Sequence, residues 1–528
     1  MRLTIFALLL GVAAAAPGPT SDQHTFASDD VTEHPGNPFP KPPNFPPPSG
    51  RETIYETLSR DSRFSRIIKA IDYIEEVAVL LNDSTTGLTF FAPDNKALRY
   101  RPKQHAMSEM HFDDSAPFYN LDNVLSGLEN LDQSFSPPFE NDDDSDDDGD
   151  WKERKRRFFK MLLRAILEYH VLPRRLDVVS LGDKMTHPTH FVVDQALGGN
   201  PQRIRTEQKS LPPILVVNFY SHIVRPDIKA SNGLIHVVDH PLLPPPSVFQ
   251  ELFMASSHFS IFVSAIQRTG LTNALDFRFT NDNDGGESRV EGTEAVTVFA
   301  PTNTAFEALP KDLRLFLFSP FGERALKKIL QYHIVPEFVL HSDYTFNRTD
   351  TLPGSDMGAF DLDSELAYQL REIRSGDAKS FYFQDRGIHF ADAEEDETIQ
   401  KHKKHKKPKH PKKPKMPWPE PISLVDLTLP TLFDDHPLHV HIGKFKLRLP
   451  IPGHDHPYRI ITKFSVDGHE LRAPDLVAMN GAVHVINKLL DPRGPHHYQA
   501  HMSGSPRSEE KMDIWKTWKT WLFQWADL

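Results

Sequence analysis

Apolar residues with helical spacing open two long stretches of the chain, at 54–71 and 248–266. In each stretch a short, continuous apolar run follows, at 88–91 and 296–299. Apolar residues that return every three or four positions indicate the buried face of a helix, whereas a short unbroken run indicates a buried strand. The pattern therefore predicts helices followed by one buried strand, twice.

The residues after each predicted strand indicate the start of another helix. Pro93 and Pro301 lack the N–H that a strand ladder needs, so we expect each strand to stop before its proline. Asn95 and Asn303 have side chains that can cap the first turn of a helix.

Two further amphipathic patterns, at 158–169 and 324–332, predict helices that end at a Tyr-His pair. A histidine at the C-terminal end of a helix suits the helix dipole, and the proline that follows soon after stops the helix. We interpret each Tyr-His pair as a packing feature.

Asn-Gly pairs at 232–233 and 480–481 predict tight hairpin turns, because both residue types tolerate a positive φ. In the strand that follows each turn, successive side chains face opposite sides. We interpret the histidine in each strand, His236 and His484, as a hydrogen-bonded structural residue rather than a ligand.

Three phrases of the sequence occur twice, in the same order. TFFAPDNKA at 89–97 returns as TVFAPTNTA at 297–305, YHVLP at 169–173 as YHIVP at 332–336, and PDIKASNGLIHVV at 226–238 as PDLVAMNGAVHVI at 474–486. A repeat with a fixed order indicates two copies of one domain. We refer to them as the first copy and the second copy.

These phrases resemble the fasciclin (FAS1) family, whose domains carry T-x-F-A-P-x-N-x-A, Y-H-x-x-P and N-G-x-[IV]-H-V segments. The resemblance implies a tandem two-domain protein of the secretory pathway, of the fungal type. It also implies an α+β fold, in which each domain is a wedge-shaped, β-sandwich-like pair of sheets with packed helices. Long disordered inserts are expected in addition.

The repeat spacing and composition divide the chain into five parts. They are a signal peptide at 1–16, a Pro-rich leader at 17–50, a first domain at 51–246 with an acidic insert at about 100–157, a second domain at 247–493 with a Lys/His-rich insert at about 341–470, and a tail at 494–528. The first part has a basic residue, a short apolar run and small residues, which is typical of a secretory signal. Secretion and the lumen of a vacuole both remain open as destinations.

Composition excludes several classes of site. The chain has no cysteine, which rules out thiol catalysis and cysteine-ligated metals. Two domains of this size bury enough surface to fold without disulfides. The formal net charge of −12 argues against a nucleic-acid partner for the whole molecule.

The first insert contains an acidic run at 140–150. A calcium loop aligned to this run would place Lys155 where a bidentate glutamate is needed, so we reject a helix-loop-helix site. The basic cluster that follows, at 152–157 around Arg156, is open to two interpretations. It is either a site for a processing protease or the charged first turns of the next helix.

The second insert carries nine lysines between Lys401 and Lys415. Such a block repels itself and suits an anionic surface, although a solvated linker explains it equally. Imidazoles that could bind zinc or copper follow this block. The candidate metal ligands are His436, His439, His441, His454 and His456, of which His439 and His441 would lie on one face of a strand. Since no fixed-spacing zinc signature is present, we assign no metal or cofactor.

The C-terminal tail places tryptophans and aliphatic residues on one face of a predicted amphipathic helix. The tryptophans are Trp515, Trp518, Trp521 and Trp525. This face either docks on one of the two domains or makes a peripheral membrane or partner contact.

Asn82 and Asn347 begin N-x-S/T sequons and are candidate glycosylation sites. The family resemblance adds one candidate recognition site. In some animal members an Asp-Ile pair before the Asn-Gly turn is linked to receptor binding, and adhesive roles have been ascribed to the Tyr-His pair. Asp227-Ile228 matches that Asp-Ile pair, and the second copy has Asp475-Leu476.

The sequence contains no nucleophile elbow, phosphate loop, zinc-protease helix or dinucleotide fingerprint. The resemblance implies a non-catalytic extracellular or lumenal protein of the adhesion type, with protein or glycan partners. One alternative is a vacuole-lumen protein with a housekeeping or glycan-related role. A hydrolase that uses a pair of carboxylates is the other.

Overall fold

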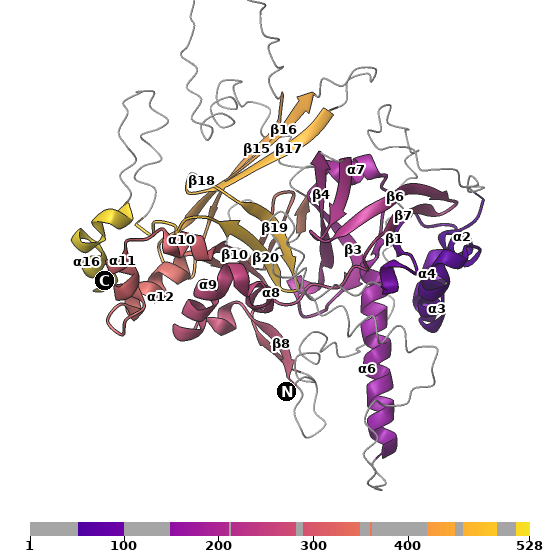
Figure 1. Cartoon of the computed structure of the whole chain (residues 1–528), viewed down its shortest axis with the longest axis horizontal. Coiled ribbons are helices and arrows are strands. Elements are labelled where there is room, and N and C mark those ends of the chain that lie inside the picture. The colour runs from indigo at the N-terminus through magenta and orange to yellow at the C-terminus, as the bar shows by residue number, and fades with distance from the viewer. Residues whose placement is uncertain are drawn as a thin grey trace, which may run out of the picture.

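The computed structural model describes residues 51–99, 148–210, 213–280, 289–348, 359–361, 420–448, 458–493 and 514–527. Helices and strands are mixed throughout these segments, as the α+β prediction requires (Figure 1). The predicted signal peptide, the Pro-rich leader, most of the acidic insert and the lysine block at 401–415 lie outside them.

The first copy is built on one seven-stranded sheet with helices beside it. Its helices are α2 (Ile54–Ser59), α3 (Ser65–Tyr73), α4 (Glu75–Asn82), α6 (Asp148–Tyr169) and α7 (Val178–Asp183), and its strands are β1 (Leu88–Pro93), β2 (Val171–Leu172), β3 (Thr186–Val192), β4 (Pro201–Ser210), β5 (Pro213–Val217), β6 (Ser221–Ala230) and β7 (Gly233–Val238). The strand order is β2-β1-β7-β6-β5-β4-β3. β1 runs parallel to β7 and antiparallel to β2.

The second copy repeats this central arrangement. Its helices are α8 (Val248–Met254), α9 (Ser256–Arg268), α10 (Asn303–Glu307), α11 (Lys311–Leu317) and α12 (Glu323–Tyr332). Its central sheet contains β10 (Val296–Pro301), β11 (Ile334–Pro336), β19 (Ala473–Ala478) and β20 (Gly481–Ile486), in the order β11-β10-β20-β19. β10 runs parallel to β20, as β1 does to β7. The shared pairing is consistent with two copies of one domain.

Smaller sheets complete the second copy. They are β8 (Phe277–Thr280) with β9 (Arg289–Gly292); β12 (Phe338–His341), β13 (Tyr344–Asn347) and β14 (Ala359–Asp361); and β15 (Glu420–Leu429), β16 (Leu438–Arg448), β17 (Tyr458–Val466) and β18 (His469–Glu470). Residues 420–448 and 458–470 were expected to belong to a disordered insert, and for these residues that expectation is wrong. Val425, Val440 and Phe464 are buried in an apolar cluster, which gives these strands a core to pack on.

The central strand of each copy lies between helices and further strands. In β1, Phe90 packs with residues of α2 to α4, whereas Phe91 packs with Leu215 and other strand residues. In β10, Val298 packs in the cluster that includes helices α9 and α12, whereas Phe299 packs with strand residues such as Val440. Because successive side chains of a strand face opposite sides, one apolar run can supply two cores.

The acidic insert also ends earlier than expected. Helix α6 begins at Asp148, so residues 148–157 are helical rather than part of a loop. This agrees with the interpretation of the basic cluster as the first turns of a helix. Whether a protease processes the chain there stays a prediction.

The two hairpins form where expected, but the reason given for them is wrong. The turn of the first hairpin is Ser231-Asn232, and neither Asn232 nor Gly233 has a positive φ. Gly233 is needed because a Cβ there would lie 2.2 Å from the carbonyl oxygen of Leu88. The Asn232 side chain accepts a hydrogen bond from the N–H of Ile54 and donates to the carbonyl of Leu81. It therefore joins the start of α2 to the end of α4.

Asn480 has the matching role in the second copy. It accepts from the N–H of Val248 and donates to the carbonyl oxygens of Leu275 and Thr293. A Cβ at Gly481 would lie 1.9 Å from the carbonyl oxygen of Val296. The Asn-Gly pair thus serves close packing rather than turn geometry.

Asn95 and Asn303 do not cap the helices that follow them. Asn95 accepts from the N–H of Arg66 in α3, and Asn303 accepts from the N–H of Ile261 in α9. Pro93 and Pro301 remain in the strands, where each is the last residue paired with the parallel neighbour. In β10 the N–H groups of Val296 and Thr302 bond towards β20, so the nitrogen of Pro301 faces the other side and its missing N–H costs no bond to β20.

One apolar cluster spans both copies. It contains Ile204 and Leu215 from the first copy together with Val339, Phe346 and Met479 from the second.

Polar contacts cross the same boundary. Gln202 donates from Nε2 to the carbonyl of Met479 at 2.9 Å, and Thr186 donates from its N–H and its hydroxyl to the carboxylate of Asp343 at 2.8 and 2.6 Å. Arg203 lies over the ring of Tyr344 at 4.2 Å. The two copies are therefore packed into one body.

The C-terminal segment is docked on the second copy (Figure 1). It comprises a 3-10 helix at Ile514–Thr520 and α16 (Leu522–Asp527), rather than the single amphipathic helix expected. Trp515 and Trp518 are buried in the apolar cluster that includes α9 and α12, and Trp518 stacks on Phe316. The docking interpretation accounts for these tryptophans.

Among the helices of the described segments, none is long and apolar enough to cross a membrane.

Candidate functional site

The Tyr-His pairs are internal. His170 and His333 are fully buried, and each accepts the N–H of a leucine, Leu242 or Leu490, at Nε2. Each Nδ1 therefore carries the proton and donates to a carbonyl one turn back in its helix. Burial lowers the pKa of both histidines to about 4, because the charged form loses its hydration. This geometry supports the packing interpretation.

The histidine of the third phrase is also structural. His236 accepts the N–H of Asp227 at Nδ1 and lies 2.9 Å from the carbonyl of Leu176 through Nε2. Asp227 has a φ of 58°, and its carboxylate caps α7 by accepting the N–H of Val178. Burial is the main cause that lowers the pKa of His236. The hydrogen bond between Asp227 and His236 stabilises a bulge in β6.

The second copy buries the same pair more deeply. Asp475 is fully buried with a φ of 62°, and its N–H donates to Nδ1 of His484. Its carboxylate accepts the N–H and the hydroxyl of Ser342 at 2.8 and 2.5 Å. Burial alone would raise the pKa of Asp475, but the contacts with His341, His484 and Ser342 hold that pKa well below its usual range.

The set of Ser342, His341 and Asp475 is not a hydrolase triad. In a triad the serine bonds to the histidine, and the histidine bonds to the carboxylate. Here the serine hydroxyl bonds directly to Asp475, and His341 lies 3.5 Å from the same carboxylate. All three side chains are buried from solvent.

The candidate recognition pairs have little exposed surface. Ile228 is buried in the core and the Asp227 side chain is 25% exposed, while Asp475 is fully buried and Leu476 is half-buried. A receptor-binding role for these residues stays a prediction.

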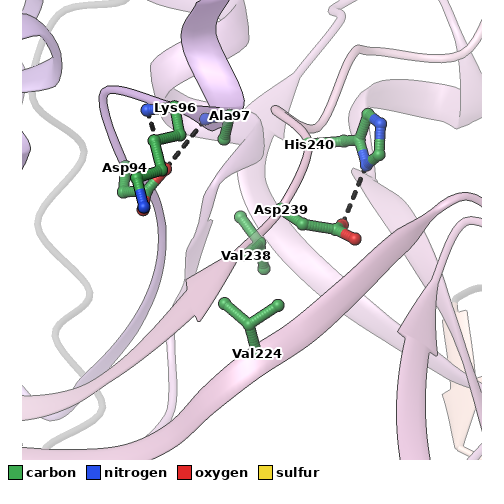
Figure 2. A pocket seen from close by; sticks show the side chains of 7 residues that line it. All are labelled: Asp94, Lys96, Ala97, Val224, Val238, Asp239 and His240. Carbon is green, nitrogen blue, oxygen red and sulfur yellow. Dashed lines mark hydrogen bonds and ion pairs between the residues drawn. The ribbon is translucent and has the colours of Figure 1, made fainter. Parts of the chain in front are cut away.

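A pocket of about 330 Å³ opens on the first copy, where the end of β1 meets β6 and the end of β7. Figure 2 shows its lining: Asp94, Lys96, Ala97, Val224, Val238, Asp239 and His240. Val224 is 57% exposed. The pocket thus combines an apolar surface with charged and imidazole groups.

Two polar residues of this lining, Asp239 and His240, lie close to His222 of β6. His222, Asp239 and His240 each offer one nitrogen or oxygen atom that could bind a metal, and these atoms lie within 4.8 Å of one another. Burial alone would raise the pKa of Asp239, but hydrogen bonds from the two histidines hold it well below its usual range. Sequence reasoning missed this group, although Asp239 and His240 directly follow the third phrase.

The histidine candidates of the second copy are not gathered in this way. His439 and His441 share one face of β16, as predicted, but they contact Thr428 and Asp426 respectively. His436 stacks on Phe433. His454 and His456 lie outside the described residues, so a site that includes them stays a prediction.

The two sequons differ in setting. Asn82 is exposed at the end of α4, and its Oδ1 accepts a hydrogen bond from the Thr53 hydroxyl. Asn347 ends β13 and is half-buried. Glycosylation of either residue stays a prediction.

Comparisons with known proteins agree on one family. The family model for the Fasciclin domain matches residues 149–244 and 257–373. Transforming growth factor-beta-induced protein ig-h3 of Sus scrofa is 33% identical over 144 residues, which are 27% of this chain and 18% of that protein. The fasciclin-like arabinogalactan protein of Arthroderma benhamiae is 32% identical over 126 residues, which are 24% of this chain and 25% of that protein.

A solved structure titled as a FAS1 domain pair from the insect cell adhesion molecule fasciclin I aligns with 81% of this chain and 98% of its own. The sequence identity is 17% and the TM-score 0.24.

Proposed function

Because this chain belongs to the fasciclin domain family, we propose that it is a non-catalytic interaction protein of the secretory pathway that binds protein or glycan partners outside the cell. The chain spans 18% and 25% of the length of these two relatives, so its partners are proposed from its own surface and its destination from its first 50 residues.

The proposal is supported by how the polar residues of the repeated phrases are used. His170, His236, His333 and His484 are buried and bonded to main-chain groups. A catalytic acid or base must reach its substrate, and these groups do not. The repeated residues therefore maintain the scaffold, which leaves recognition to exposed surfaces that differ between the copies.

The first-copy pocket is the surface that we assign to partner recognition. Its exposed apolar side chain, Val224, can pack against the CH face of a sugar or an apolar side chain. Lys96 and Asp239 at its polar side can hydrogen-bond to hydroxyl or amide groups. Pockets that bind ligands usually combine an apolar lining with a few polar groups that set orientation.

A binding assay with the full chain tests the function. Immobilised protein is exposed to a panel of cell-surface polysaccharides and secreted proteins, and both retention and product formation are measured. We expect saturable retention of a partner that is recovered chemically unchanged. Time-dependent appearance of a cleaved product would contradict the non-catalytic assignment, and so would the absence of retention across the panel.

The destination has its own test. We expect a chain expressed with its first 50 residues to appear in the medium or at the cell surface, and a chain that begins at residue 51 to remain inside. Accumulation of the full chain in a vacuole would favour the lumenal alternative over the extracellular one.

A further inference from the structure

We propose that His222, Asp239 and His240 form a binding site for a divalent transition metal, zinc or copper, at the edge of the first-copy pocket. Among the residues that the structure describes, these three are the group whose potential donor atoms lie within 4.8 Å of one another. The metal site shares Asp239 and His240 with the lining of the pocket, but it can be tested without knowing the partner and can fail while the proposed function holds.

The donor atoms are close to the spacing that a metal requires. Nδ1 of His222 lies 3.0 Å from Oδ2 of Asp239, and Nδ1 of His240 lies 2.8 Å from Oδ1. Tetrahedral zinc with ligand distances of about 2.0–2.1 Å places its ligand atoms roughly 3.3 Å apart. The two nitrogen–oxygen distances are a few tenths of an ångström shorter than this, and all the ligand atoms lie within 4.8 Å of one another, so a metal requires a modest rearrangement of the two rings around the carboxylate.

The surrounding structure holds the ligands in place. The Asp239 carboxylate accepts the N–H of His222 at 2.7 Å, and the Asp239 N–H donates to the carbonyl of His222. The Ser221 hydroxyl donates to the carbonyl of His240, whose ring meets the edge of Tyr220. Supporting contacts of this kind orient metal ligands and limit their movement.

The site is open to ions from solution. The side chains of His222, Asp239 and His240 are 37%, 33% and 21% exposed. Figure 2 shows Asp239 and His240 together at the pocket. Two nitrogen ligands and one carboxylate favour zinc or copper over calcium or magnesium, and three protein ligands leave a position for water or an anionic group that enters the pocket.

The second copy shows that the fold does not require this cluster. Counted from the paired histidines His236 and His484, the positions of Asp239 and His240 are taken by Asn487 and Lys488. Those two residues are exposed in the structure. The double substitution Asp239→Asn/His240→Lys therefore gives the first copy the residues that the second copy has at the corresponding positions.

Calorimetric titration of the chelator-treated full chain with zinc at neutral pH tests the site. We expect wild type to bind one more equivalent of zinc than Asp239→Asn/His240→Lys, with at least tenfold higher affinity than the remaining sites. The histidines at 402–410 are present in both proteins, so the difference isolates the cluster. The control Asn487→Ala/Lys488→Ala is expected to retain the wild-type stoichiometry.

Thermal unfolding supplies a second measurement. Zinc should raise the Tm of wild type and leave the Tm of the double variant unchanged, because a ligand stabilises only the state that binds it. Identical zinc isotherms for wild type and a double variant with wild-type Tm would overturn the proposal. An equal stabilisation by calcium would overturn the nitrogen-ligated assignment.

Discussion

At the scale of single residues, the polar groups of the repeated phrases serve packing rather than chemistry. Asn232, His236 and Asp227 connect segments that are far apart in the sequence through hydrogen bonds to the main chain. The sequence indicated that the histidines are structural. It could not indicate their partners, because Leu176 and Leu242 contribute only backbone atoms, and any residue type has those.

Asp227 and Asp475 provide a matched pair of substitutions. Asp475→Ala should destabilise the protein by roughly 3 kcal/mol, because it leaves the N–H and hydroxyl of Ser342 buried without an acceptor. Asp227→Ala should cost less, because its side chain is 25% exposed and water can replace it. Chemical denaturation measures the loss of unfolding free energy in both variants. Equal losses would contradict the role given to burial.

The buried neutral histidines predict a loss of stability in acid. In the folded state the pKa of His170, His333 and His484 is lowered to about 4, whereas the ordinary value is 6.5. The unfolded chain therefore takes up protons first as the pH falls. The stabilisation is complete above pH 6.5 and decreases towards pH 4, by about 2 kcal/mol per histidine at pH 5.

Denaturation between pH 7 and pH 4 measures this dependence. His333→Gln can still donate to the Ile329 carbonyl and accept the N–H of Leu490 without titrating. We expect this variant to lose less stability on acidification than wild type. A steeper loss in the variant would show that His333 does not contribute as described.

At the scale of elements, the sequence predicted the repeated strands and helices well and the inserts poorly. Strands β1 and β10 form because unbroken apolar runs can be buried on both faces. Strands β15 and β17 were not predicted, because the lysine block before them indicated a charged, disordered insert. Their own alternation in Val425, Leu427 and Leu429 is the signal that could have identified a strand.

The C-terminal segment yields a prediction at this scale. Trp518→Ala should destabilise the protein by about 3–5 kcal/mol, because Trp518 is 5% exposed and stacks on Phe316. The neighbouring Lys519→Ala should have a small effect, because the ion pair between Lys519 and Asp312 is exposed. Thermal unfolding compares the stability of these two variants. Unchanged stability in Trp518→Ala would favour the membrane or partner interpretation of the segment.

At the scale of the whole molecule, the copies act as one folded unit. Neither repeat spacing nor composition predicted that Phe346 and Met479 would share a core with Ile204, because contacts between copies leave no periodic pattern. The pocket and the His222 cluster lie within the first copy and were missed because their residues are far apart in the sequence. Their residues come from the ends of β1, β6 and β7, which only the folded sheet brings together.

Phe346→Ala tests the coupling between the copies. The substitution empties space in the shared apolar cluster, so we expect a loss of roughly 3–5 kcal/mol and the separation of one calorimetric transition into two. Leu315→Ala, at a side chain that is 67% exposed, is the control and should keep a single transition. Two transitions already present in wild type would contradict a shared core.

In the proposed function, the first-copy pocket recognises the partner while the repeated residues maintain the scaffold. Val224→Glu places a charge on the exposed apolar surface of the pocket, and Leu315→Glu does the same at an exposed leucine of the second copy. The most direct measurement is the affinity of both full-length variants for the partner retained in the binding assay. We predict at least a tenfold loss for Val224→Glu at unchanged Tm and wild-type affinity for Leu315→Glu. Wild-type affinity in Val224→Glu would contradict the account.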